Sequence, residues 1–240
     1  MSNRPMRHFS CYGDARNKGF CVHCGGSGET DDHVPSKVFL DEPLPANVMV
    51  SPACFPCNNG LSLDEEYLAC LIECAAIGEI DPNRMERQKI ANILRKNLRL
   101  SEMLRKAKSW TDDGSIQWRA DPERVRNVVL KLARGHVAYD LNEPQLGDPI
   151  AVSFRPLCTM TVQERQAFEA EPDVELGDFA LWPEVGSRAM SALLIVGKSA
   201  FEEGWLVVQP DRYRYRTVQE AGIGVRFVIR EYLACEVIWQ

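Results

Sequence analysis

Apolar residues in the middle of the chain recur at the three- and four-residue spacing of amphipathic helices. The first stripe predicts a helix from Leu63 to about Ile77, because Ser62 and Glu65 have capping-box spacing and Gly78 follows the last turn. The stripe consists of Leu63, Tyr67, Leu71 and Ala75.

Two Asp-Pro pairs mark further helix starts, since aspartate caps a helix and proline suits its first turn. Asp81-Pro82 opens a helix over "DPNRMERQKIANILRKN", and a short helix is expected after Ser101. Asp121-Pro122 opens another over "ERVRNVVLKLARGHVAYDL". We therefore predict that the middle of the protein is helical.

After about residue 146 the pattern changes to short β-branched or aromatic runs bounded by Gly, Pro or charge, which is typical of strands. A helix capped by Thr161 and Glu164 interrupts these runs. The expected strands are 150–154, 192–196, 205–209, 212–216, 225–230 and 234–239. This part of the chain predicts a small α+β unit with an antiparallel sheet.

These patterns predict an α+β protein in three parts. Residues 1–80 form a cysteine-rich module with a short extended run at Val48 to Val50, and residues 81–145 form a helical basic segment. Residues 146–240 form an α+β domain whose role the sequence does not reveal.

Composition limits the classes of protein to which the chain can belong. With 240 residues, of which 45% are hydrophobic, the chain can bury a sizeable core. It has no run of 18 apolar residues and no apolar segment near its N-terminus, so we expect no membrane span, no secretory signal and a cytoplasmic location. Thiols stay reduced in the cytoplasm, so the nine cysteines predict metal ligands and buried thiols and no disulfide framework.

The net charge of -6 argues mildly against a nucleic-acid-binding protein, but the charges are unevenly distributed. The segment from Arg84 to Lys108 has nine Lys or Arg against two Glu. Such a run is either a solvated helix face or a surface that binds phosphates, and the second interpretation gains weight only beside a nuclease site.

Two cysteine pairs have the spacing of a zinc site. Cys21 and Cys24 form one pair, and Cys54 and Cys57 form the other, each with two residues between its thiols. One turn can present both thiolates of such a pair to a tetrahedral zinc ion. The loop between the pairs contains Asp32 and His33, and Asn58 and Asn59 follow the last cysteine.

The order Cys-x2-Cys, Asp-His, Cys-x2-Cys-Asn resembles the HNH, or His-Me finger, nucleases. It is most similar to their phage Holliday-junction resolvase branch, and the resemblance covers about Gly19 to Ile77. It implies a ββα-metal fold on a treble-clef zinc site, in which Cys21, Cys24, Cys54 and Cys57 hold a structural zinc ion.

The resemblance also implies a catalytic role for three residues. Asp32 binds a catalytic Mg²⁺ or Mn²⁺ ion, and His33 is the general base that takes a proton from the attacking water. Asn58 either binds the same ion or orients the loop that bears His33. Many relatives add a histidine on the helix, which this chain lacks, so Asn59, Asp64 or Glu65 is the candidate for any further ligand.

Other residues favour structural roles. We expect His23 to be an exposed knuckle residue, Cys70 and Cys74 to be core thiols, and His136 to complement a helix dipole. Cys11, Cys158 and Cys235 are expected to be packing residues. The alternation of Tyr213 and Tyr215 with Arg212, Arg214 and Arg216, near Trp205, indicates a half-buried sheet with an arginine face more readily than a surface that stacks on bases.

The sequence therefore predicts a metal-dependent endonuclease that hydrolyses DNA phosphodiesters, with RNA left open as substrate. The alternative is a non-catalytic treble-clef zinc module that binds DNA or a protein partner. A third hypothesis is an effector nuclease that stays inert until its C-terminal part receives a signal, from a regulatory partner or from a second copy of the chain.

Overall fold

A computed structural model describes residues 18–45, 48–170, 201–202, 204–219 and 222–240. The chain forms two compact units, one of Met1–Gly60 with Val129–Gln240 and the other of Leu61–Val128. The predicted strand at 192–196 and the predicted packing role of Cys11 lie outside the described residues.

The first unit begins with a β-hairpin followed by a short helix. Strands β1 (Thr30–Val34) and β2 (Met49–Ala53) pair antiparallel in a continuous register that sets Asp32 opposite Ser51 and His33 opposite Val50. The 3-10 helix η1 (Lys37–Phe39) lies between them in sequence, and α1 (Phe55–Gly60) follows β2. The extended run expected at Val48 to Val50 is thus part of a real strand.

The same unit contains a six-stranded antiparallel sheet in the order β5-β10-β9-β8-β7-β6. The last four strands in sequence succeed one another as neighbours, so most of the sheet is a meander. The elements are β5 (Ala151–Pro156), η2 (Leu157–Thr159), α6 (Val162–Glu169), β6 (Phe201–Glu202), β7 (Trp205–Gln209), β8 (Tyr213–Gln219), β9 (Ile223–Ile229) and β10 (Leu233–Trp239). The predicted antiparallel sheet is confirmed.

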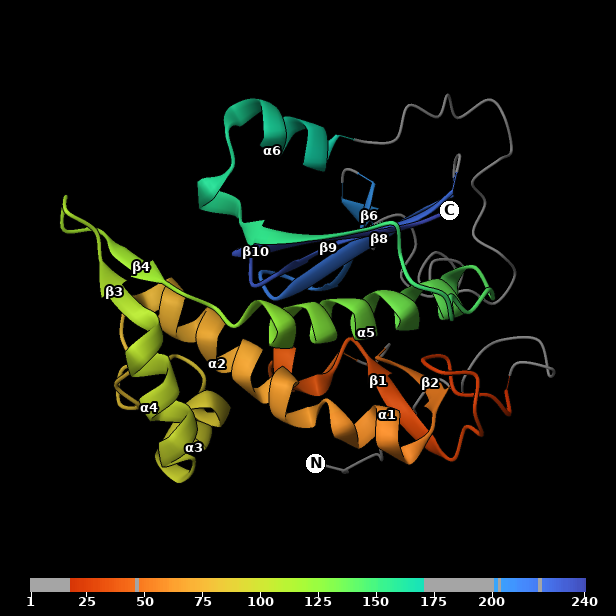
Figure 1. Ribbon diagram of the computed structural model, residues 1–240, viewed down its shortest axis with the longest axis horizontal. Helices are drawn as coiled ribbons and strands as arrows, with labels where there is room; N and C mark the ends of the chain where they lie inside the picture. Colours follow the sequence, from red (N-terminus) through yellow and green to blue (C-terminus); the bar gives the residue numbers. More distant parts are fainter. Residues whose placement is uncertain (1–17, 46–47, 171–200, 203, 220–221) are drawn as a thin grey trace. The chain divides into compact units, whose positions relative to one another are not determined.

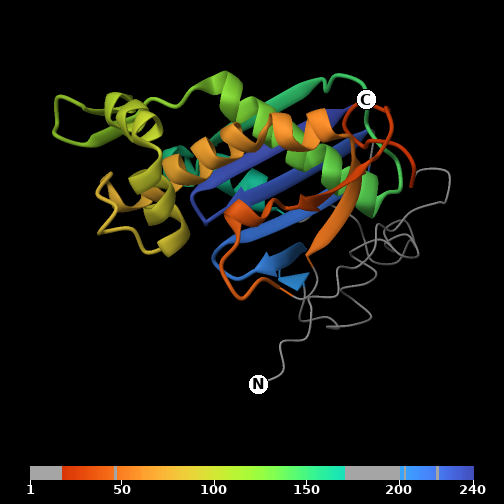
Figure 2. The same ribbon diagram turned by 90° about the horizontal axis from the view of Figure 1, so that it is seen from below.

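Helices cover both faces of this sheet, with α6 on one face and α5 (Pro122–Asp140) on the other (Figure 1). Seen from below, α5 lies across the sheet strands (Figure 2). On the α5 face, the ring of His136 stacks on Tyr215 with centroids 3.8 Å apart, and its Nε2 lies 2.8 Å from the Tyr213 hydroxyl. His136 is fully buried between helix and sheet, and its role beside the helix dipole stays a prediction.

The α6 face combines a small apolar core with arginines. The core contains Leu157, Phe168, Trp205, Val228 and Ala234. The guanidinium groups of Arg214 and Arg216 each lie 4.4 Å from the centroid of the Trp205 ring. Arg214 also pairs with Glu169 at 2.7 Å and with Glu231 at 2.7 Å. The predicted arginine face is confirmed, and its charges are neutralised within the fold.

The second unit is mainly helical, as predicted, with one hairpin that the sequence did not indicate. It contains α2 (Ser62–Ile77), α3 (Gln88–Lys96), α4 (Leu98–Ala107), β3 (Lys108–Trp110), β4 (Ile116–Trp118) and the first turns of α5. The predicted capping box at Ser62 is absent, because Leu61 is the N-cap. Helix α3 begins at Gln88, six residues after Pro82, so the Asp81-Pro82 pair marks a turn and no helix start.

Candidate zinc and phosphodiester site

The first cysteine pair lies in a tight turn before β1. The Cys21 amide donates to the Gly26 carbonyl at 2.7 Å, and the Gly25 amide donates to the Cys21 carbonyl at 2.8 Å. Gly25 has a φ of 74°, in the left-handed region that glycine adopts at little cost. This turn directs both thiols of the pair toward one point.

The second cysteine pair joins β2 to α1 and meets the first pair. The four Sγ atoms all lie within 4.8 Å of one another, and Cys24 Sγ is 3.7 Å from Cys54 Sγ. In a tetrahedral site with Zn–S bonds of about 2.3 Å, sulfurs are separated by about 3.8 Å. The four cysteines therefore fit a zinc ion in both ligand type and spacing.

Without an ion, the Cys57 thiol is in an unfavourable environment for ionisation. Burial raises the pKa of Cys57 strongly, and hydrogen bonds with Cys54 and Cys24 add to the rise. A bound zinc ion reverses this effect, because a coordinating thiol gives up its proton. Zinc binding here is therefore expected to release protons and to be coupled to folding of the hairpin.

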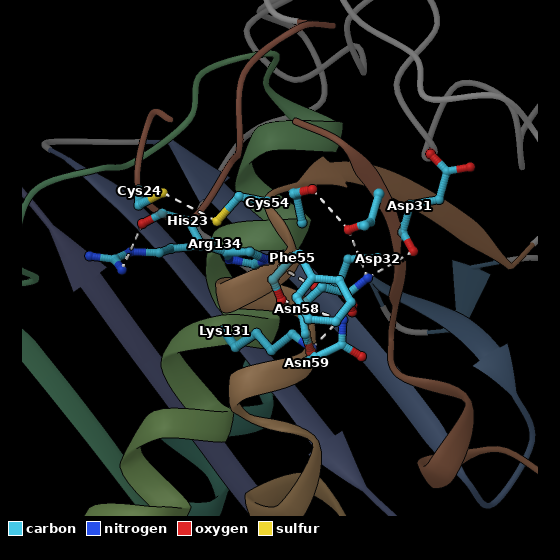
Figure 3. A network of polar contacts seen from close by, with 12 residues as sticks. His23, Cys24, Asp31, Asp32, Cys54, Phe55, Asn58, Asn59, Lys131 and Arg134 are labelled. Atoms are coloured by element: carbon cyan, nitrogen blue, oxygen red, sulfur yellow. Dashed lines mark hydrogen bonds and ion pairs between the residues drawn. The ribbon is translucent and has the colours of Figure 1, made fainter. Parts of the chain in front are cut away.

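Asp32 is buried beside this cluster and has two partners. Its Oδ2 lies 2.9 Å from Nε2 of His23, and its Oδ1 lies 3.1 Å from Nζ of Lys131. The side chains of all three residues are at most 6% exposed. The expectation that His23 is an exposed knuckle residue is wrong, because its ring turns inward to meet Asp32 (Figure 3).

Asn58 lies across the same space from Asp32. Its Nδ2 donates to Oγ1 of Thr30 at 3.0 Å and to the carbonyl of Asp31 at 3.2 Å, which fixes the start of α1 against β1. Its backbone carbonyl accepts a hydrogen bond of 3.4 Å from Lys131. The Asp32 carboxylate and the Asn58 backbone carbonyl thus both contact the Lys131 ammonium.

That charge comes from α5, which supplies two residues that sequence reasoning did not assign to the site. Lys131 extends from α5 toward Asp32 and Asn58, and Arg134, one turn later, donates to the carbonyl of His23 at 3.2 Å (Figure 3). The signal was available in "VVLKLARGHV", where Lys131 and Arg134 interrupt an apolar run. A charge inside an apolar stripe usually has a buried partner.

Helix α5 is held close to the hairpin by a glycine. A Cβ atom built on Gly135 would lie 2.6 Å from Cγ2 of Val34, far inside van der Waals contact. Only glycine therefore allows this approach of helix and strand. Gly135 lies four residues after Lys131 on α5, so this contact also fixes the position of the Lys131 backbone.

His33 follows Asp32 on β1, and successive side chains of a strand leave it on opposite faces. Asp32 and Val34 are buried, whereas His33 is partly exposed on the face that it shares with Asp31. The imidazole is therefore on the other side of the strand from the Asp32 carboxylate.

The three candidates for a further ligand have other partners or lie in the other unit. Asn59 donates from Nδ2 to the Phe55 carbonyl at 3.4 Å. Asp64 accepts from Nε of Arg124 at 2.6 Å and from Nδ2 of Asn127 at 3.2 Å, within the second unit. Glu65 is buried in that unit.

The divalent ion implied at Asp32 and Asn58 does not fit the arrangement described. Both oxygens of Asp32 already contact nitrogen atoms, and the Lys131 ammonium lies between the carboxylate and Asn58. An ammonium and a divalent cation on the same buried carboxylate would repel each other strongly. We therefore derive no chemical step through such an ion.

Comparisons with protein-family models, with curated proteins and with solved structures find no match to this chain. The site must therefore be interpreted from its own chemistry. Among the helices of the described residues, none combines the length and the apolar character that a membrane crossing requires.

Two remaining predictions about cysteines have different outcomes. Cys70 and Cys74 are completely buried in α2, which confirms them as core thiols, and Cys235 is buried in β10. Cys158 is exposed, so its assignment as a packing residue is wrong.

Proposed function

We propose that the protein is an endonuclease of the HNH type that hydrolyses phosphodiester bonds of DNA. The observation that carries this proposal is the position of Asp32 and Asn58 directly beside a four-cysteine cluster, with Lys131 in contact with the Asp32 carboxylate and the Asn58 backbone carbonyl. The sequence motif singles out these two residues, and they lie on the hairpin and helix on which the motif depends.

In this proposal the zinc ion has a structural role. A two-stranded hairpin with one short helix buries little apolar area, so metal binding would supply free energy that packing cannot. The tetrathiolate site would fix the ends of β1 and β2 in a treble-clef arrangement. Asp32, His33 and Asn58 would then keep their spacing when a nucleic acid binds.

His33 is the proposed general base. Imidazole titrates near neutral pH, so its neutral form can accept a proton from water and afterwards release it to solvent. It lies on the more exposed face of β1, opposite Asp32, although its Nε2 atom is buried there. The Asp32 carboxylate, which is buried and paired, is the poorer candidate for this role.

The basic segment from Arg84 to Lys108 is the proposed contact with the phosphate backbone. Seven of its nine cationic side chains are exposed, on α3, on α4 and just before α3: Arg84, Lys89, Arg95, Lys96, Arg99, Arg105 and Lys106. Contacts of this kind give affinity with little sequence specificity and make binding strongly dependent on salt. The proposed partner is therefore DNA, bound with little dependence on its base sequence.

The buried Lys131–Asp32 pair favours a second candidate, a non-catalytic zinc module that binds DNA or a protein partner. In that case Asp32 would act only as an anchor for α5. The two candidates differ in whether bound DNA is cut.

The test is nicking of supercoiled plasmid by the zinc-loaded full chain in the presence of Mg²⁺ or Mn²⁺. We expect nicked circles from the wild type, little activity from His33→Ala and near wild-type activity from Asp31→Ala, which alters the exposed neighbour of Asp32. Removing a general base typically costs about 10²–10⁴-fold in rate.

DNA affinity, measured in parallel by fluorescence anisotropy at several salt concentrations, separates the candidates. Tight binding without any nicking, in wild type and variants alike, would favour the non-catalytic module. Equal nicking by wild type and His33→Ala would remove the catalytic assignment of His33.

A further inference from the structure

The side chain of Lys131 raises a question because it is both charged and buried. Its exposed fraction is 3%, and its ammonium lies 3.1 Å from Oδ1 of Asp32 and 3.4 Å from the carbonyl of Asn58. Burying a lysine is costly unless a carboxylate and hydrogen-bond acceptors replace the lost water. Lys131 has both, which indicates that a positive charge at this point is part of the fold.

The surrounding groups explain why the position requires a cation. Asp32 contributes one negative charge, and four thiolates with one Zn²⁺ ion would carry a formal charge of about -2. Lys131 and Arg134 lie one turn apart on α5 and both reach into the finger (Figure 3). Helix α5 therefore supplies the positive charges that balance the hairpin.

The position of the ammonium is also notable for the residues it contacts. Asp32 is a residue that an HNH-type nuclease would use for its divalent ion, and Lys131 contacts its carboxylate, whereas at Asn58 it contacts the backbone carbonyl and not the side chain. A monovalent cation that is part of the chain thus occupies the Asp32 carboxylate, at which an exchangeable ion would be needed. Both cations cannot be there together.

We propose that Lys131 is the resident cation of this site and excludes divalent ions from Asp32 until bound DNA displaces its side chain. The inference rests on the proposed function only for the identity of the site, and the exclusion of the ion is a property that can be measured alone. Gly135 holds α5 tightly against Val34 one turn away, so withdrawal would take place by rotation of the flexible lysine stem.

The test uses Mn²⁺ as the probe with the zinc-loaded full chain, and bound Mn²⁺ is followed by electron paramagnetic resonance. We expect wild type to show no Mn²⁺ binding that depends on Asp32. Lys131→Gln is expected to bind one equivalent at Mn²⁺ concentrations where wild type binds none, a gain in affinity on the order of 5–150-fold, the usual range for coupled ligands. Asp32→Asn in the same background should abolish that binding.

Two further variants control for charge and for general surface effects. Lys131→Arg keeps a cation in place and is expected to exclude Mn²⁺ as wild type does. Lys18→Gln removes an exposed lysine outside the basic segment and should leave Mn²⁺ binding unchanged.

A folding readout keeps the test decisive if Lys131→Gln is unstable. This variant leaves Asp32 with an uncompensated charge, so it should melt at a lower temperature than wild type and recover when Mn²⁺ is added. Wild type should show no Mn²⁺-dependent rise that Asp32→Asn removes. One equivalent of Asp32-dependent Mn²⁺ in wild type, or no recovery of Lys131→Gln, would overturn the proposal.

Plasmid nicking by the same samples separates this inference from the proposed function. If Lys131→Gln binds Mn²⁺ without cutting DNA, the proposed role of Lys131 as resident cation is supported and the proposed nuclease function is refuted. If wild type binds Mn²⁺ through Asp32 and cuts DNA through His33, the nuclease stands and the resident cation fails.

Discussion

The cysteine hairpin and the six-stranded sheet belong to one compact unit but are stabilised in different ways. The sheet has helices on both faces and a continuous set of buried apolar residues, including Tyr215, Val225 and Phe227. The hairpin has only two strands, and beside buried apolar residues such as Met49 and Val50 it has four clustered thiols, one buried ion pair and a glycine contact with α5.

The difference shows where each region is vulnerable. A region stabilised by burial loses free energy in proportion to the apolar area that a substitution removes. A region stabilised by a few polar contacts loses much when one charge is left without its partner. Single substitutions should therefore damage the two regions by separate routes, and the predictions below test that separation.

Loss of a zinc ligand should have the largest effect. Cys54→Ser, or removal of the metal by a strong chelator, should unfold the hairpin, because structural zinc contributes on the order of 10 kcal/mol or more. Hydrogen exchange should become fast over residues 20–57, while residues 205–239 keep their protection. Zinc content by elemental analysis should fall from one equivalent to none.

Two controls make this result specific. Cys158→Ser removes an exposed thiol and should leave both regions intact. Phe227→Ala should destabilise the sheet by about 3–5 kcal/mol without lowering zinc content. Loss of sheet protection on chelation would mean that the two regions are not separable.

The buried ion pair should come next. Asp32→Ala leaves the Lys131 ammonium buried without its carboxylate, at a cost of about 3–5 kcal/mol in unfolding free energy. The double variant Asp32→Ala/Lys131→Met should recover part of this loss, since both charges are then absent. Denaturant unfolding measures both values, and additive losses from the two substitutions would contradict the pairing.

The close contact between α5 and β1 should give a smaller effect. Gly135→Ala introduces a Cβ atom against Val34, an overpacking that costs about 1–3 kcal/mol, against a gain of about 1 kcal/mol in helix propensity. Shortening the partner should relieve the clash. In a Val34→Ala background the same substitution should therefore be neutral or stabilising, and an unchanged penalty would refute the contact.

The smallest effect concerns acid stability of the helix on the sheet. The Arg155 guanidinium, together with Thr161, lowers the pKa of Glu164 from its ordinary value of 4.5 to about 2. Because the folded pKa lies below the unfolded one, this stabilisation is complete above about pH 4.5 and is lost as the pH falls toward about 2. Glu164→Gln should flatten the rise of stability with pH in that window.

The matched control is Glu143→Gln, which removes an exposed carboxylate outside the helix cap. It should leave the slope between those pH values unchanged. Equal slopes for wild type and Glu164→Gln, by thermal unfolding across the range, would show that the cap contributes nothing there.

Periodicity was sufficient to predict α2, α5 and α6 and the positions of most sheet strands. It placed the start of α3 too early, because the Asp81-Pro82 pair only makes a turn: the Asn83 amide donates to the Asp81 side chain and the helix begins later. It also missed the hairpin of β3 and β4, whose three-residue strands are too short to show alternation.

The four-cysteine cluster could be predicted from the sequence because both cysteine pairs are local motifs. The environment of Asp32 could not be predicted, since Lys131 lies 99 positions away and only the tertiary fold brings it to the hairpin. His23 was misjudged for the same reason: a residue between two ligands points outward unless a buried acceptor draws it in.

The unbroken register of β1 against β2 has a consequence for any redesign of this finger. Inserting one residue ahead of Asp32 would rotate every later side chain to the opposite face. The carboxylate would then meet solvent, and the Lys131 ammonium would lose its partner. Changes in length are therefore tolerable only outside the paired segment, and any grafted version must carry Thr30–Val34 and Met49–Ala53 as a fixed block.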